Sequence, residues 1–307
     1  MHIFDNPHEN RIRAGWRLLL QFIIFLFLLM FSRLLLGDVL GENLMLVWYS
    51  VIATLSVWFA AKTLDQRRLR EYGLEADREW VKHFLTGAVL GGVTMAVLFL
   101  VYLALGWVEL IGFGWDRSRN GSFSLAFAGY FLAMCSVGYY EELWSRGYQT
   151  KNLAEGLNFA RFKTKYAVLA AILLTSVFFG LLHAFNPFAS VLSTIIITLA
   201  GVMFAIPYVV TGRLGLSIGL HISWNFFQGG IFGFPVSGVS NRISIIQIRT
   251  SGPELWTGGL FGPEAGLSGL LAVMALTGVI ILYLKKTGYN LTPAAGFAGW
   301  VDKDVSK

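Results

Sequence analysis

Long apolar runs recur along the chain, separated by short polar segments. They cover about residues 17–37, 44–63, 84–107, 124–148, 166–185, 190–211, 214–232 and 267–284. Each is close to the roughly 20 residues with which a helix crosses the hydrocarbon of a bilayer. An unclosed strand would leave its backbone unsatisfied in lipid, so each run is expected to be helical. The pattern predicts an all-α, polytopic membrane bundle of about eight transmembrane helices.

Composition supports a membrane protein and excludes several other classes. Hydrophobic residues make up 55% of the 307 residues and charged residues 14%, against about 25% charged in soluble proteins. Cys135 is the sole cysteine, so no disulfide forms within the chain. We expect three regions: 1–123 with three spans and a cytoplasmic amphipathic segment, 124–232 as a four-helix catalytic core, and 233–307 with an external loop, the last span and a cytoplasmic tail.

The basic residues indicate the orientation. With the amino terminus inside, 18 of the 24 Lys and Arg residues fall on the cytoplasmic side. Arg117, Arg119, Arg242 and Arg249 fall on the other side, and Arg33 and Arg146 lie within helices. The positive-inside rule therefore predicts two cytoplasmic termini. Because topology accounts for most of the net charge of +6, nucleic acid is not expected as a partner.

Two polar segments allow alternative interpretations. Residues 65–83 mix charges with Leu, Tyr and Trp, which favours an amphipathic helix on the inner membrane surface or else a solvated loop. Residues 231–266 are rich in Gly, Pro and Ser around the β-branched run Ile243 to Ile248. We expect this segment to be an external loop with a small hairpin or a re-entrant piece.

Ionisable groups inside the spans need a partner or a function, because burying a charge in hydrocarbon costs at least about 2.5 kcal/mol. Glu142 and Arg146 are four residues apart in the fourth span and are expected to pair on one helical face. Glu141 lies about 100° around the helix from Glu142. It is therefore expected to be the carboxylate left for general-base chemistry.

Two further spans supply imidazole and amide groups. His221 and Asn225 are four residues apart, so both can reach one atom, as the donors of an oxyanion hole do. Phe179 lies one turn before His183 and is expected to pack against its ring. A single intramembrane His or Asn is more often an interhelical hydrogen-bond partner. The joint occurrence of Glu141, His183, His221 and Asn225 favours a hydrolytic site.

These motifs resemble the CAAX protease and bacteriocin-processing (CPBP) family of intramembrane endopeptidases, in a bacterial form. The resemblance rests on Glu-Glu-x-x-x-Arg at 141–146, Phe-x-x-x-His at 179–183 and His-x-x-x-Asn at 221–225. It is close over about 141–230 and extends to Asp65–Leu74 and Gly252–Gly266. It implies that Glu141 and His183 activate a water, that His221 and Asn225 hold the oxyanion, and that Glu142, Arg146 and Phe179 support the site or bind a substrate end.

The resemblance leaves the cofactor open between two forms. Glu141, His183 and His221 could form a zinc site with an open position for water. No His-Glu-x-x-His sequence supports that site, and a protease without a cofactor is favoured. The expected partners are membrane lipid and a peptide or protein substrate, and the expected location is the bacterial inner (cytoplasmic) membrane.

Glu141 and His221 are expected near the middle of the membrane, whereas His183 is expected near the far end of its span. This difference in depth would keep His183 away from the other two groups. We expect the turn at 184–189 to be sunk within the protein to bring the groups together. We also expect the site to open toward the cytoplasm.

The function expected is hydrolysis of a peptide bond in a membrane-associated or lipidated substrate. Two other classes remain: a transporter-like protein, in which intramembrane Glu, His and Asn relay protons, and a non-catalytic immunity or scaffold protein that binds peptides without cutting them.

Overall fold

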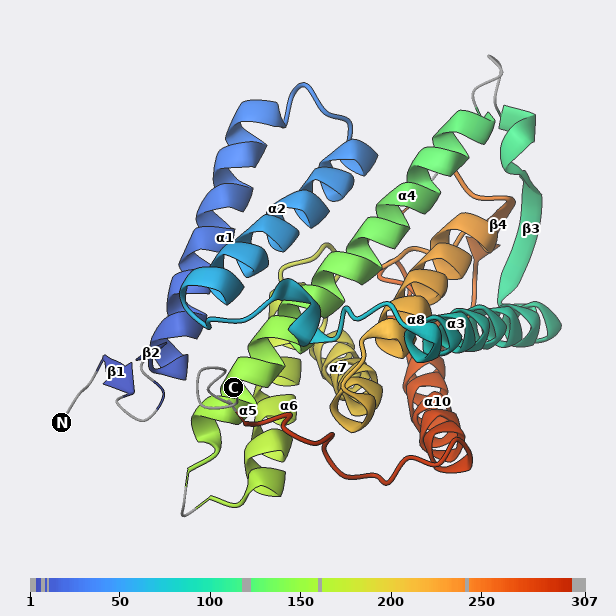
Figure 1. Ribbon diagram of the computed structural model, residues 1–307. Coiled ribbons are helices and arrows are strands. Elements are labelled where there is room, and N and C mark those ends of the chain that lie inside the picture. Colours follow the sequence, from blue (N-terminus) through green and yellow to red (C-terminus); the bar gives the residue numbers. More distant parts are fainter. Residues whose placement is uncertain are drawn as a thin grey trace.

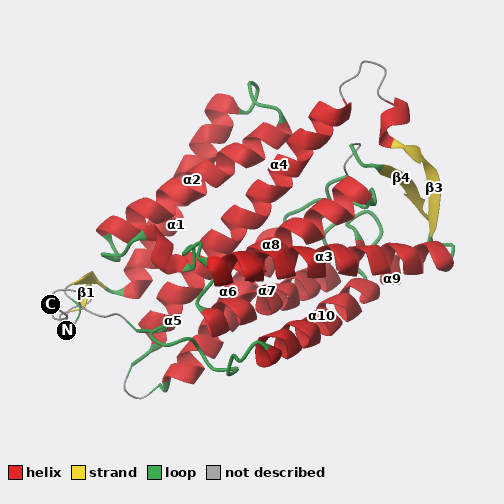
Figure 2. Cartoon of the chain, turned by 45° about the vertical axis from the view of Figure 1, so that its right-hand side comes forward, coloured by secondary structure: helices red, strands yellow, loops and turns green. Residues whose placement is uncertain are grey.

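The chain folds into a helical bundle with little sheet (Figures 1 and 2). The structure is a computed structural model and describes residues 4–6, 9, 11–117, 123–159, 162–240 and 243–299. Arg119 and Arg242, which the orientation argument counts, lie outside these residues. The long helices are α1 (Ala14–Leu36), α2 (Glu42–Thr63), α3 (Arg78–Ala104), α4 (Phe123–Glu141), α6 (Thr164–His183), α7 (Val191–Thr211) and α10 (Leu267–Lys286).

Shorter elements connect these helices. They are strands β1 (Asp5–Asn6), β2 (Arg11–Ile12), β3 (Val108–Phe113) and β4 (Ile246–Thr250), helices α5 (Lys151–Leu157), α8 (Gly215–Asn225) and α9 (Glu254–Thr257), the π-helical segments Glu142–Thr150 and Phe226–Ile231, and the 3₁₀ turns Leu69–Tyr72, Gly114–Arg117 and Pro263–Ala265.

Seven helices in the described part of the chain are long and apolar enough to cross a membrane. The fourth of them continues from α4 through a π-helical segment and α5 to Leu157, over 35 residues. The predicted polytopic bundle is confirmed. One expected span, 214–232, differs: α8 has 11 residues and its π-helical continuation six. Most of α8 is buried, because it is enclosed by other helices rather than by lipid.

Helix α8 lies directly against α3 (Figures 1 and 2), and glycines on both helices allow the close approach. A Cβ at Gly87 of α3 would lie 2.3 Å from the Leu216 carbonyl oxygen, and one at Gly219 of α8 would lie 2.1 Å from the Phe84 carbonyl oxygen. Gly91 and Gly215 repeat these contacts one turn away. Small residues four apart on facing helices are the usual means of close packing between membrane helices.

The start of α8 is also tied to the start of α3. Asp77 caps α3 by accepting the Trp80 N–H at 2.8 Å, and Arg213, just before α8, donates to the same carboxylate at 2.6 Å. These hydrogen bonds, the Arg213 one first, lower the pKa of Asp77 to about 2. The carboxylate therefore stays ionised unless the pH falls toward that value, and the ion pair persists throughout the neutral range.

Residues 65–77 form a connection between α2 and α3 that contains one 3₁₀ turn and carries buried charges. The expected amphipathic helix at 65–83 is therefore wrong. Asp65 is fully buried and accepts from Arg17 at 2.5 Å and from the Tyr72 hydroxyl at 2.8 Å. Arg67 donates to Glu155 of α5 at 3.0 Å and to the Gly299 carbonyl oxygen at 2.9 Å. The charges point inward because partners from four segments compensate them there.

Glu155 is the centre of this cluster. Besides Arg67 it contacts Arg11, and it accepts from Arg17 at 3.4 Å. Its side chain is 3% exposed. One carboxylate thus joins the segment before α1, α1 itself, the turn after α2 and, through Arg67, the segment after α10.

At the other end of the bundle, long-range pairing replaces the expected local hairpin around 243–248. Strand β4 pairs antiparallel with β3, from Val108 opposite Thr250 to Phe113 opposite Ile246. The partner strand is more than a hundred residues away, so no turn residue signals it. The turn at 184–189 also differs from expectation. It is not sunk within the protein, since Phe185 is 88% and Phe188 61% exposed.

Replacing Glu155 by Ala is expected to destabilise the protein by about 3–5 kcal/mol, because it leaves buried guanidinium groups without their counter-charge. Thermal unfolding in detergent measures the change. Glu75→Ala is the matched control, since the Glu75–Arg70 pair is more than half exposed at both side chains and exposed pairs contribute little. Equal unfolding temperatures for the two variants would contradict the role given to Glu155.

Candidate active site

The acidic motif lies where α4 changes into the π-helical segment Glu142–Thr150. Thr150 Oγ1 donates to the Ser145 carbonyl oxygen five residues earlier, in keeping with the wider π-helical turn. Glu142 is 0% and Arg146 1% exposed. Arg146 Nη1 donates to Glu142 Oε1 at 2.9 Å, which confirms the predicted pair. Short π-helical segments are often found at functional sites.

Arg146 is also held by aromatic rings on two neighbouring helices. Its guanidinium carbon lies 4.1 Å from the ring centre of Phe179 on α6 and 5.3 Å from that of Phe204 on α7. A guanidinium over an aromatic face is attracted by the ring quadrupole. Arg146 is only 1% exposed. Its guanidinium group is therefore enclosed by Glu142 and the two rings and does not face the cavity. Binding of a substrate end by Arg146, one of the roles considered from the sequence, has no support from this arrangement.

Glu142 connects the acidic motif to α8. Its Oε1 also accepts from His221 Nδ1 at 2.8 Å. A carboxylate only accepts, so Nδ1 carries the hydrogen and the ring is held with Nε2 directed away from Glu142. His221 Nε2 lies 3.8 Å from Glu141 Oε2. The imidazole therefore stands between two carboxylates that are adjacent in the sequence.

Glu141 remains available for chemistry. Its Oε1 accepts from the Tyr140 hydroxyl at 3.4 Å, and its Oε2 has no hydrogen-bond partner among the described residues. Buried polar atoms in folded proteins nearly always find a partner. An unpaired carboxylate oxygen facing a cavity is therefore a place for a water or a substrate hydrogen.

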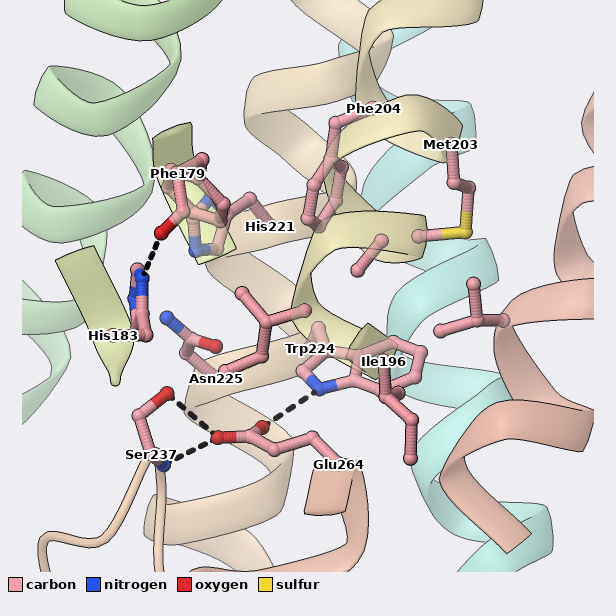
Figure 3. A pocket seen from close by; sticks show the side chains of 13 residues that line it. Phe179, His183, Ile196, Met203, Phe204, His221, Trp224, Asn225, Ser237 and Glu264 are labelled. Carbon is pink, nitrogen blue, oxygen red and sulfur yellow. Dashed lines mark hydrogen bonds between the residues drawn. The ribbon is translucent and has the colours of Figure 1, made fainter. Parts of the chain in front are cut away.

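His183 ends α6, and its ring is fixed by its own helix (Figure 3). Nδ1 donates to the Phe179 carbonyl oxygen at 2.8 Å, which leaves Nε2 with a lone pair in the neutral ring. The Phe179 and His183 ring centres lie 4.5 Å apart, so the predicted contact between them is confirmed.

All four expected catalytic side chains line one cavity of about 520 Å³. Asn225, the last residue of α8, is 7% exposed and lies beside His183 (Figure 3). A smaller adjoining cavity of about 40 Å³ contains His183, His221 and Asn225 but not Glu141. The structure thus brings Glu141, His183, His221 and Asn225 together from three separate helical segments.

The large cavity extends from the site toward the α1–α2 connection. Beyond the site its lining is mostly apolar, with Phe25, Leu26 and Leu29 of α1 and Leu46 of α2, and it reaches Glu42 and Asn43 at the start of α2. Val239 and Ser240, after the second π-helical segment, complete that end. This end of the bundle is opposite the buried charge cluster of Glu155. The expected opening on the basic, terminal side is therefore not where the cavity lies.

The zinc alternative depends on the nitrogen atoms that the two imidazole rings leave free. Nδ1 of His183 and Nδ1 of His221 are both used in hydrogen bonds within the protein, so Nε2 of each ring is the nitrogen left for a water or for a metal ion. Among the described residues no three His, Cys, Asp or Glu side chains are grouped so that they could hold a metal ion.

Sequence reasoning missed two residues at the site. Ser237 lines both cavities, and Glu264 lines the smaller one. Both lie in the long segment after α8, where no periodicity relates them to the motifs. The only signal was the weaker resemblance at Gly252–Gly266, which gave no role to any residue.

An acid, two imidazoles and an amide around one cavity in a bundle of membrane-spanning helices are groups that an intramembrane hydrolase can use. One comparison with known proteins supports that class. Residues 121–227 match the family model described as type II CAAX prenyl endopeptidase Rce1-like. No curated protein and no solved structure matches. The matched region contains Glu141, His183, His221 and Asn225. The chain is thus a multi-pass membrane protein in which residues 121–227 are similar to the Rce1-like CAAX-type intramembrane endopeptidases.

Gly201 of α7 leaves the space that Arg146 needs. A Cβ there would lie 3.1 Å from Ser176 Oγ and 3.2 Å from Arg146 Nη2. We expect Gly201→Ala to displace the guanidinium, to cost about 1–3 kcal/mol of stability through overpacking and to lower cleavage activity. Thermal unfolding and a peptide-cleavage assay measure both effects.

The control is Gly278→Ala in α10, where a Cβ would meet nothing within 4 Å. It should be neutral or stabilise the helix by about 0.5–1 kcal/mol. A Gly201→Ala protein as stable and as active as this control would show that Arg146 does not need the space.

Proposed function

We propose that this chain cleaves a peptide bond by adding a water activated by Glu141. The observation that carries the proposal is the grouping of the unpaired Glu141 Oε2 with His183, His221 and Asn225 around one cavity. Glu141 takes a proton from the water as the water oxygen bonds to the carbonyl carbon. His183, whose Nε2 keeps a lone pair, accepts a hydrogen bond from the second hydrogen of that water, which stays on the water oxygen.

His221 and Asn225 stabilise the negative charge on the carbonyl oxygen. Two carboxylates flank the His221 ring, at 2.8 Å and 3.8 Å. Glu142 holds Nδ1 of this ring, so Nε2 is the nitrogen that can donate toward the cavity. Its Nε2–H and the Asn225 amide then donate to the oxyanion. Collapse breaks the C–N bond, and Glu141 returns its proton to the leaving nitrogen.

The cavity supports a membrane-associated or lipid-modified substrate. Its volume of about 520 Å³ lies in the range of pockets that enclose drug-sized ligands, and its α1 and α2 walls are apolar. The name of the matched family refers to prenylated substrates. A peptide with a lipid chain next to the scissile bond could place the chain along these walls and the carbonyl group at Glu141.

We propose that the protein lies in the bacterial inner membrane with both termini cytoplasmic. The excess of Lys and Arg on the side of the termini supports this orientation. The end of the cavity at Glu42 and Ser240 then faces the opposite side of the membrane, from which water and substrate reach the site.

Glu141→Gln is expected to lower cleavage at least about a hundredfold, since loss of a general base typically costs 10²–10⁴ in rate. The assay uses protein reconstituted in vesicles and internally quenched peptides, with either farnesylcysteine or unmodified cysteine before three apolar residues. Glu109→Gln on β3, an exposed acid, is the control and should cleave normally. A folded Glu141→Gln protein that cleaves at the control rate would exclude this mechanism.

Removal of divalent metal is expected to leave activity unchanged, because the groups proposed to activate water are a carboxylate and an imidazole. Cleavage is measured before and after dialysis against a chelator, together with the metal content of the purified protein. Loss of activity with the chelator, restored by stoichiometric zinc, would favour the metal-dependent form.

A further inference from the structure

A tight turn after α8 forms one wall of the site. Val236 and Val239 exchange backbone hydrogen bonds at 3.0 and 2.9 Å and close the turn. Ser237 has φ +47° and Gly238 φ +84°, a conformation that glycine tolerates and serine rarely adopts. Ser237 lines both cavities beside His183, His221 and Asn225. Something must hold Ser237 in this unfavoured conformation.

Glu264 holds it. One carboxylate oxygen, Oε1, accepts from the Ser237 hydroxyl at 2.7 Å and contacts the Ser237 backbone N–H. The other, Oε2, lies 3.4 Å from Trp224 Nε1 of α8 (Figure 3). Glu264 is 6% exposed, and a carboxylate so buried is costly unless donors surround it. These donors tie the segment 263–265 both to the turn and to the helix that carries His221 and Asn225.

The other side of the turn rests on the segment that follows His183. The Ser237 carbonyl oxygen accepts from Asn186 Nδ2 at 3.0 Å. A Cβ at Gly238 would lie 2.0 Å from the Pro187 carbonyl oxygen. The backbone of the turn therefore packs directly against the backbone at Pro187. The turn is therefore fixed between Glu264 and the end of α6, and its position relative to the catalytic groups follows from these contacts.

The fixed turn limits a small pocket at the site. The cavity of about 40 Å³ is bounded by Glu264 and Ser237 on one side and by apolar residues on the other, among them Ile196, Met203 and Phe204. It is far smaller than the neighbouring cavity of about 520 Å³. A small side chain next to the scissile bond therefore fits there better than an aromatic one while the scissile carbonyl group is at Glu141.

We propose that Glu264 is a specificity-determining residue, which sets the size of the substrate side chain accepted next to the scissile bond by holding the turn 236–239. The inference rests on the proposed peptidase function. Glu264 acts through Ser237 and the pocket wall and takes no part in the transfer of protons. It lies outside the residues that match the family model, so it adds a determinant of this chain to the shared catalytic groups.

The test compares substrate selectivity in reconstituted protein. The probes are internally quenched farnesylcysteine peptides in which the residue that follows the scissile bond is Ala or Phe. Wild-type protein should cleave the Ala peptide with kcat/KM at least about tenfold above the Phe peptide. Glu264→Ala should bring this ratio close to one, because it enlarges the pocket and releases the turn. Glu254→Ala, which removes an exposed acid from the same loop, should keep the wild-type ratio.

An unchanged ratio in folded, active Glu264→Ala protein would overturn the inference, as would a wild-type enzyme with no preference between the Ala and Phe peptides. If Glu264→Ala does not fold, Ser237→Val decides. A β-branched residue cannot adopt the required φ without strain, so an unchanged ratio in that variant overturns the inference equally. These results are distinct from failure of the peptidase function, which appears as no cleavage by wild-type protein or as full activity of Glu141→Gln.

Discussion

A buried guanidinium group organises the centre of this protein. Arg146 is almost fully enclosed, and an unpaired charge in such surroundings is not tolerated. Glu142 compensates it and, with the same oxygen atom, fixes His221 on α8. The compensation of one charge therefore determines where an imidazole of the site lies and which of its nitrogens faces Glu141. The chemistry at the cavity depends on a charge pair that the substrate does not reach.

Close helix contacts make this arrangement possible. Glycines on α3 and α8 bring their backbones together, Gly138 of α4 leaves room for Ile222 of α8, and Gly180 of α6 leaves room for Thr198 of α7. The groups proposed as catalytic come from α4, α6 and α8, and the contact at Gly138 joins two of these helices directly. The helix changes to π-helical geometry directly after Glu141 and again directly after Asn225, so both motif helices depart from regular α geometry at the cavity.

The site combines two parts of different origin in the chain. The groups proposed as catalytic lie in the region that matches the Rce1-like family model, whereas Ser237 and Glu264 belong to the segment that follows it. The two parts meet through Trp224 and Asn186. Substitutions in the loop segment can therefore change the shape of the pocket without moving the groups proposed to act on the peptide bond. Binding loops supported by rigid elements are common in proteins.

The sequence alone determined the features that depend on local periodicity and on the cost of burial in lipid. Seven of the eight expected spans follow from the length of the apolar runs, and the Glu142–Arg146 pair and the Phe179–His183 contact follow from spacing along one helix. The candidate groups stood out because charges are rare in hydrocarbon. Only the tertiary structure decided that α8 is short and enclosed, that Asp65 points inward to Arg17, that β3 pairs with β4, and that Glu264 supports the site. Each of these depends on a partner far away in the chain, and side-chain spacing within a segment carries no information about which distant segment will compensate its charge or complete its hydrogen bonds.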